Sequence, residues 1–122
     1  MKIRIDSLDT LCSEYIRKRA LSRVHGCERC RRFKESYKQL QCSHYHKRRK
    51  QSTRFDEDNC NGFCFGCHQY FEENRDEYTV WMKQQLGVKF DMLEGRMRQI
   101  GKPDRKAIAL YYKEQIKILE EV

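Results

Sequence analysis

The chain has 122 residues, a length typical of one domain, with 39% hydrophobic residues, 36% charged residues and a formal net charge of +8. No stretch approaches the roughly 20 apolar residues that span a bilayer, and the first residues lack the apolar run of a signal peptide. These features exclude an integral membrane protein and predict a cytoplasmic one whose modest core gains from a bound metal ion.

The first predicted element is a helix, capped by Asp6 or Ser7, that runs from Leu8 to about Leu21 because apolar residues recur there at helical spacing. A basic, cysteine-bearing knuckle follows, and then two short strands joined by a polar, basic loop. We place the knuckle at residues 27–38, the strands at 39–45 and 54–63, and the loop at 46–53. The turn-prone run Asp56-Glu57-Asp58-Asn59 is expected to break the second strand.

Helices are predicted for the rest of the chain, from Cys64 onward, with a short one around residues 91–100. In an earlier one Asn74 is the expected N-cap, with Glu77 as its capping box, and Gly87 ends the helix. The last helix should open at Pro103 and end near Glu120. The predicted buried positions are Tyr78, Trp81, Met82 and Leu86 before Gly87, and Ile108, Tyr111, Tyr112, Gln115, Ile118 and Leu119 in the last helix.

Positive charge is concentrated in one segment of the chain. Residues 17–54 contain fourteen Lys and Arg against two acidic residues, a net charge of +12, whereas the remaining residues sum to −4. Basic charge gathered in this way suits a polyanionic partner, and we expect DNA or RNA. A basic surface that is merely solvated is the alternative.

Two Cys-X-X-Cys pairs, Cys27/Cys30 and Cys64/Cys67, indicate a metal site. Each pair folds a tight knuckle whose two thiolates face one ion, and two knuckles complete a tetrahedral Zn²⁺ site without an open position, which is structural and not catalytic. An odd total of seven cysteines argues against a disulfide framework. The remaining cysteines, Cys12, Cys42 and Cys60, are expected to be small buried residues.

Three polar residues surround this cysteine framework at a characteristic spacing. His44 ends a predicted strand, Asn59 lies five residues before a zinc cysteine, and His68 directly follows the last one. The pattern resembles the HNH motif of ββα-metal (His-Me finger) endonucleases. Together with the start Leu8-Asp9-Thr10-Leu11-Cys12-Ser13-Glu14-Tyr15-Ile16-Arg17, the segments Cys42-Ser43-His44, Asp58-Asn59 and Cys67-His68 are similar to phage recombination nucleases of the NinG (Rap) type, over most of residues 8–100.

The resemblance implies a role for each of these residues in hydrolysis of a DNA phosphodiester bond to 5′-phosphate and 3′-hydroxyl products. A neutral imidazole near pH 7 can deprotonate water, so His44 is the expected general base. His68 is the expected ligand of a catalytic Mg²⁺ or Mn²⁺ ion. Asn59 is expected to hold the loop and the strand that carries His44.

The second protein ligand of that ion is open from sequence. Many HNH enzymes carry Asp or His directly before the base, where this chain has Ser43, a poor ligand for a hard cation. His46 matches a second histidine found in relatives that resemble endonuclease VII, a phage junction resolvase. An acid at positions 56–58, or water and phosphate, are the remaining candidates, and two imidazoles would favour Mn²⁺.

The expected fold is thus a single α+β domain over residues 1–122. It has a zinc-stapled, treble-clef-like ββα-metal core (27–73) with a two-stranded antiparallel sheet, between an N-terminal helix (1–26) and C-terminal helices (74–122). Arg48, Arg49 and Arg54 are expected to contact DNA phosphates, and a homodimer through the C-terminal helices would allow double-strand cuts. Such a protein belongs in the cytoplasm of a bacterial or phage-infected cell. The alternatives are a non-catalytic zinc module that binds nucleic acid and an adaptor that binds proteins through the C-terminal helices.

Overall fold

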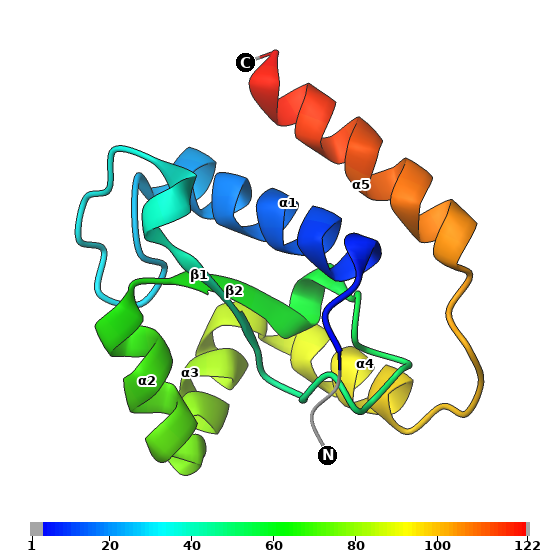
Figure 1. The fold of residues 1–122 in the computed structure, drawn as a ribbon. Helices are drawn as coiled ribbons and strands as arrows, with labels where there is room; N and C mark the ends of the chain where they lie inside the picture. Colours follow the sequence, from blue (N-terminus) through cyan, green and yellow to red (C-terminus); the bar gives the residue numbers. More distant parts are fainter. Residues whose placement is uncertain (1–3, 122) are drawn as a thin grey trace.

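The computed structural model describes residues 4–121, in which helices surround one small antiparallel sheet (Figure 1). This arrangement confirms the predicted mixture of helices with two antiparallel strands. In chain order the elements are α1 (Ser7–Val24), η1 (Tyr37–Gln39), β1 (Gln41–His44), η2 (Glu57–Asn59), β2 (Cys60–Phe63), α2 (Phe65–Glu73), α3 (Arg75–Leu86), α4 (Val88–Met97) and α5 (Arg105–Glu120).

Helix α1 begins at a reciprocal cap and crosses the sheet. The Asp6 side chain accepts hydrogen bonds from the backbone of Leu8 and Asp9, and the Asp9 side chain accepts one from the Asp6 backbone. The helix backbone approaches β2 so closely that a Cβ on Gly62 would lie 2.7 Å from the Ala20 methyl carbon. Only glycine leaves room for this contact.

The register of the two strands places the polar side chains of Ser43 and Asn61 on one face of the sheet and His44 with two cysteines on the other. His44 lies opposite Cys60, Cys42 opposite Gly62, and Ser43 opposite Asn61. Because neighbouring residues of a strand face opposite sides, Ser43 and Asn61 point toward the aromatic core of α2, α3 and α4. Cys42, His44 and Cys60 point to the opposite side, where α1 lies.

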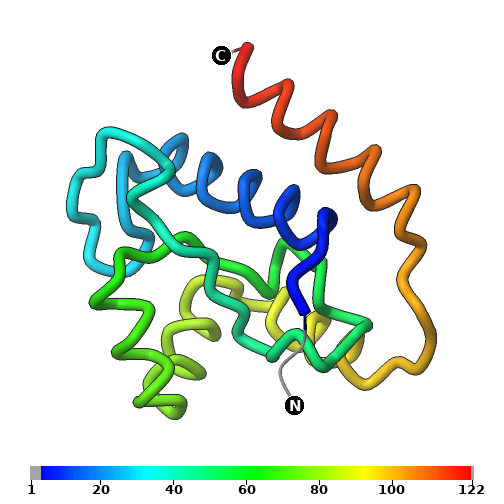
Figure 2. Tube along the Cα trace, viewed as in Figure 1, coloured from blue at the N-terminus to red at the C-terminus, as the bar shows by residue number. Residues whose placement is uncertain are grey.

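Helix α5 lies beside α1 and runs parallel to it (Figure 1). Arg105 at the start of α5 pairs with Asp6 at 2.7 Å, and Glu120 at its end pairs with Lys18 at 2.9 Å. Between these ion pairs Tyr112 and Ile116 are buried against α1. The chain path in Figure 2 shows how residues 98–104 return from α4 to the start of α5.

Several predicted boundaries are wrong in instructive ways. The break expected at residues 56–59 is present, because the Asp56 side chain accepts a hydrogen bond from the Asp58 backbone and closes the turn that leads into η2. Strand pairing occurs only after this break, over Cys60–Phe63, and contrary to the prediction Arg54 and Phe55 are not part of the strand. Asn74 is the N-cap of α3 and Gly87 ends that helix, as predicted, but Asn74 does not form the expected capping box with Glu77. Helices α2 and α3 follow each other without a loop, so its amide instead donates to the Tyr70 carbonyl and closes α2.

The last helices also differ from the prediction. Helix α4 begins directly after Gly87, whose φ of 57° ends α3, and not near Asp91. Helix α5 is capped by Asp104 and not opened by Pro103. Its buried face includes Ile116, which the sequence did not indicate, whereas Tyr111 and Ile118 are 43% and 45% exposed. Among residues 4–121 no helix is both long and apolar enough to cross a membrane.

Candidate active site and metal centre

Four cysteines converge between the turn after α1 and the start of α2. The sulfur atoms of Cys27, Cys30, Cys64 and Cys67 all lie within 4.8 Å of one another, and those of Cys30 and Cys64 are 3.9 Å apart. A zinc ion with bonds of about 2.3 Å places its tetrahedral sulfur ligands about 3.8 Å apart. The cluster can therefore hold a structural metal such as zinc, and His25, which ends α1 with φ 58°, is not part of it.

The backbone of the first knuckle is tied to the sheet. The Glu28 amide donates to the Gly62 carbonyl at 2.9 Å, and the Glu28 carboxylate accepts from the Gly62 amide at 2.9 Å. Arg29 donates to the Cys67 sulfur at 3.4 Å across the two knuckles. A metal at the cysteines would thus hold α1, β2 and the start of α2 in one arrangement.

His44 and His68 line the same pocket, which has a volume of about 540 Å³. The pocket opens between the end of β1, the first residues of the basic loop, one face of α2 and the first turns of α1. Its walls are formed by Ile5, Asp9, Thr10, Ser13, Cys42, His44, Lys47, Arg48, His68 and Glu72. Two of the three residues of the HNH pattern thus meet in one cavity.

The surroundings of His44 determine which of its nitrogens is free. Its Nε2 lies 3.1 Å from the carbonyl oxygen of Arg54, and because a carbonyl only accepts, Nε2 carries the proton. The lone pair is then on Nδ1. Burial, with a smaller contribution from the charge of Arg48, lowers the pKa of His44 to about 4. The imidazole is therefore neutral over a wider pH range than that of an exposed histidine, whose pKa is about 6.5.

His68 is positioned by the cysteine framework and by β1. It occupies the first turn of α2, directly after Cys67, and its Nδ1 hydrogen-bonds to the side-chain oxygen of Gln41. A proton on Nδ1 leaves the lone pair of Nε2 free to bind a cation. Burial lowers the pKa of His68, which also favours the neutral form.

Glu72 is a site residue that the sequence reasoning missed. It lies one helical turn after His68 on α2 and lines the same pocket, where it forms an ion pair with Lys47. The signal was present in the sequence, since residues four apart share one face of a helix. A carboxylate oxygen beside an imidazole nitrogen provides the kind of donor that Mg²⁺ and Mn²⁺ bind.

Asn59 lies outside the pocket and is fully buried. Its side-chain oxygen accepts from the His46 amide at 2.8 Å, and its side-chain nitrogen donates to the carbonyls of His46 and Thr53 at 2.9 and 3.1 Å. One side chain thereby joins the two ends of the basic loop. Asn59 can therefore hold the end of β1, which carries His44, against the far end of the basic loop.

The residues considered as second metal ligands lie elsewhere. Ser43 is fully buried on the opposite face of β1, with its hydroxyl 2.9 Å from that of Tyr78. His46 points away from the pocket, and its Nε2 lies 2.5 Å from a carboxylate oxygen of Glu94. Asp56 and Asp58 pair with Arg96 of α4, and Glu57 bonds to Tyr15 and Tyr111. The expectation that Ser43 or His46 shares an ion with His68 is therefore corrected.

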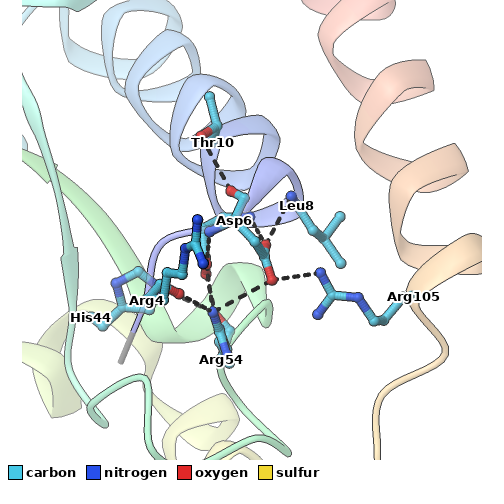
Figure 3. Close-up of polar contacts among 8 residues, drawn as sticks. Arg4, Asp6, Leu8, Thr10, His44, Arg54 and Arg105 are labelled. Atoms are coloured by element: carbon cyan, nitrogen blue, oxygen red, sulfur yellow. Dashed lines mark hydrogen bonds and ion pairs between the residues drawn. The ribbon is translucent and has the colours of Figure 1, made fainter. Parts of the chain in front are cut away.

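The Arg54 side chain points into the protein, toward Arg4 and Asp6 at the start of α1 (Figure 3). Its guanidinium is buried and pairs with both carboxylate oxygens of Asp9, at 2.9 and 2.5 Å, and it also donates to the Arg4 carbonyl. Its expected contact with a DNA phosphate is corrected, because this guanidinium already has its partners inside the protein. Instead, the pair anchors the backbone whose carbonyl holds His44.

The two other arginines of the basic loop differ in their surroundings. Arg49 is exposed, as expected for a contact with a flanking phosphate. Arg48 lines the pocket beside His44, and its Nη1 atom is buried without a hydrogen-bond partner among the described residues. A buried guanidinium nitrogen without a partner is costly unless a ligand satisfies it. Arg48 is therefore suited to an anionic group that enters the pocket.

A comparison with known families agrees with this picture. A family model described as the bacteriophage lambda NinG protein matches residues 2–121. The chain belongs to the NinG family. The match includes α5, which the resemblance in the sequence had not covered, and so places the C-terminal helix within the family's own domain. Neither the curated proteins nor the solved structures include a significant match to the chain.

Proposed function

We propose that this NinG family member is a metal-dependent endonuclease that hydrolyses phosphodiester bonds of DNA. The observation that carries the proposal is the content of one pocket: a neutral imidazole with a free Nδ1, a second imidazole with a free Nε2, and a guanidinium nitrogen of Arg48 that has no hydrogen-bond partner within residues 4–121. These groups match the needs of phosphodiester hydrolysis, which are a base for water, a cation ligand and a cationic contact to phosphate.

His44 acts as the general base in this proposal. Nδ1 takes a proton from water, and the carbonyl of Arg54 stabilises the resulting imidazolium through Nε2. The buried pair of Asp9 and Arg54 holds that carbonyl in place, so these two are positioning residues. Arg48 binds a non-bridging oxygen of the phosphate and offsets the charge that grows during the attack.

His68 and Glu72 would hold a Mg²⁺ or Mn²⁺ ion, whose chemistry is to polarise the phosphate and stabilise the leaving 3′ oxygen. One imidazole and one carboxylate are compatible with either ion. The order of elements, two antiparallel strands followed by α2 with a histidine in its first turn, supports a ββα-metal core. The four-cysteine centre fixes the first turn of that helix and hence the position of His68.

Duplex or branched DNA of phage recombination is the proposed substrate. The net charge of +12 over residues 17–54 provides long-range attraction to DNA, and membership of the NinG family supports a role in recombination. The exposed Lys50 and Arg49 lie beyond the pocket in the same loop. They are placed to contact phosphates that flank the one being cut.

The deciding experiment measures nicking of supercoiled plasmid and cleavage of a synthetic four-way junction by purified protein with Mg²⁺ or Mn²⁺. We expect cleavage that EDTA stops and that yields 5′-phosphate ends. DNA binding without cleavage in either metal would contradict the proposal and would favour the non-catalytic zinc module.

A further inference from the structure

A second group of metal-binding side chains lies at the floor of the pocket. The sulfur atoms of Cys42 and Cys60 and a ring nitrogen of His44 all lie within 4.8 Å of one another. The sheet register explains this, because His44 lies opposite Cys60 and Cys42 precedes it by two residues on the same face. None of these three side chains belongs to the four-cysteine centre.

The group has a buried side and an open side. Cys60 is fully buried and packs in one cluster with Cys12 of α1 and with Cys42. Cys42 and His44 line the pocket and are only partly buried. A small cation could therefore enter from the pocket and meet two sulfurs and one nitrogen, with a water molecule as the fourth ligand.

The chemistry of these donors selects the cation. Thiolate and imidazole ligands prefer Zn²⁺ in a tetrahedral site and are poor ligands for Mg²⁺. Two thiolates neutralise a divalent charge, which favours occupancy of a buried site close to Arg48 and Arg54. Binding releases the two thiol protons to solvent, and no electron transfer is involved.

We propose that Cys42, His44 and Cys60 form a second zinc site, and that zinc bound there inhibits the enzyme. The inhibitory part rests on the proposed endonuclease function; the binding part does not. His44 donates through Nε2 to Arg54, so its free lone pair is on Nδ1. A cation held by His44 takes the electron pair that would accept a proton from water. Zinc and the proton of the attacking water therefore compete for Nδ1 of His44, whereas His68 and Glu72, the proposed ligands of the catalytic ion, stay free.

Cobalt binding tests the site without any need for activity. Protein that already contains one zinc per chain is titrated with Co²⁺, and thiolate-to-cobalt charge transfer and tetrahedral d–d absorption are recorded. We expect about one further equivalent of Co²⁺ with both signals, and their loss in Cys42→Ala. Thr10→Ala, which alters another wall of the same pocket, is the matched control and should bind like the unaltered protein.

Two results would overturn the second site. One is the absence of these absorption bands in the unaltered protein at excess Co²⁺. The other is equal bands in Cys42→Ala, which would mean that cobalt exchanges into the four-cysteine centre. Retained zinc at the four-cysteine centre and an unchanged circular dichroism spectrum show that each variant is folded. If Cys42→Ala does not fold, Cys42→Ser replaces it in the same titration.

Cleavage assays then test the inhibition separately. In the presence of Mn²⁺, we expect the Zn²⁺ concentration for half-inhibition to rise at least tenfold in Cys42→Ala. Unchanged zinc sensitivity would refute the inhibitory role even if cobalt binds. Cobalt bands in a protein that never cleaves DNA would instead refute the proposed function and leave the second zinc site standing.

Discussion

The four-cysteine centre and the histidine pocket each take one residue from the first turn of α2, Cys67 and His68, yet they are built differently. The centre uses two short motifs, Cys27/Cys30 and Cys64/Cys67, whose spacing alone brings each pair of sulfurs together. The pocket takes side chains from α1, β1, the basic loop and α2, and depends on contacts between distant segments. Substitution of a cysteine in the centre should therefore release the metal and unfold the protein. Substitution of a histidine in the pocket should abolish cleavage and leave the fold intact.

The largest effect is expected at the four-cysteine centre. Cys64→Ser removes a ligand from a site that in small zinc domains contributes on the order of 10 kcal/mol to folding. We expect loss of zinc and of the cooperative unfolding transition, measured by metal analysis and circular dichroism. Cys42→Ala, outside the centre, should keep one zinc per chain. A folded, zinc-free Cys64→Ser protein would show that the cysteines do not form a structural site.

The next effect is loss of cleavage with the fold intact. His44→Ala should lower the nicking rate by about 10²- to 10⁴-fold, the usual loss for a general base, without loss of the zinc at the four-cysteine centre or of DNA affinity. Higher pH should partly restore the rate, because hydroxide needs no base. His68→Ala should respond to added Mn²⁺ and not to pH, and Glu72→Gln should behave in the same way. Wild-type nicking by His44→Ala would refute the mechanism.

The buried ion pair behind His44 comes third. Asp9→Asn leaves the buried guanidinium of Arg54 without its anionic partner, and breaking such a pair costs about 3–5 kcal/mol. Asp6→Asn is the matched control, because Asp6 is partly exposed, lies 3.7 Å from the same guanidinium and keeps its helix cap as asparagine. Urea unfolding should show a loss of under about 1 kcal/mol for the control. Equal losses would mean that the pair does not anchor the pocket.

The pKa of His44 predicts a pH-dependent stability. Burial lowers it to about 4 in the folded protein, against about 6.5 in the unfolded chain. Below pH 6.5 the unfolded chain binds a proton that the folded protein does not, so stability falls as the pH decreases toward 4. At pH 5 the protein should be about 2 kcal/mol less stable to unfolding than at neutral pH because of His44, and His44→Gln should not show this loss. Parallel pH profiles for the two proteins, measured by urea unfolding, would contradict the burial of this imidazole.

The smallest effect concerns DNA affinity. Arg48→Ala and Arg49→Ala should each reduce the slope of log affinity against log salt by about one, as expected for one phosphate contact. Lys113→Ala, an exposed basic residue of α5, is the control and should leave the slope unchanged. If only Lys113→Ala reduces the slope, the DNA-binding surface lies on the C-terminal helix.

These predictions separate what local spacing encodes from what packing adds. The first helix, the two strands and the cysteine framework could be predicted because each depends on residues close in sequence. The break at residues 56–59 could also be predicted, because the run Asp56-Glu57-Asp58-Asn59 is turn-prone. Arg54 and Phe55 were wrongly assigned to the strand, since the side-chain hydrogen bonds that hold this loop are visible only in the structure. The buried face of α5 was predicted only in part, because its partner, α1, lies about a hundred residues earlier in the chain: Tyr112, Ile108 and Leu119 pack as expected, whereas Ile116 was missed and Tyr111 and Ile118 are exposed.

The sequence by itself determined the mixed fold, the zinc-type cysteine centre and the histidines that meet in the pocket, because these follow from motif spacing and strand alternation. Only the tertiary structure decided the partners of each charged group. It paired Arg54 with Asp9, turned Ser43 and His46 away, and brought Glu72 and Arg48 to the pocket. Ion pairing and burial depend on which groups share a low-dielectric space, and that choice is made when distant segments pack.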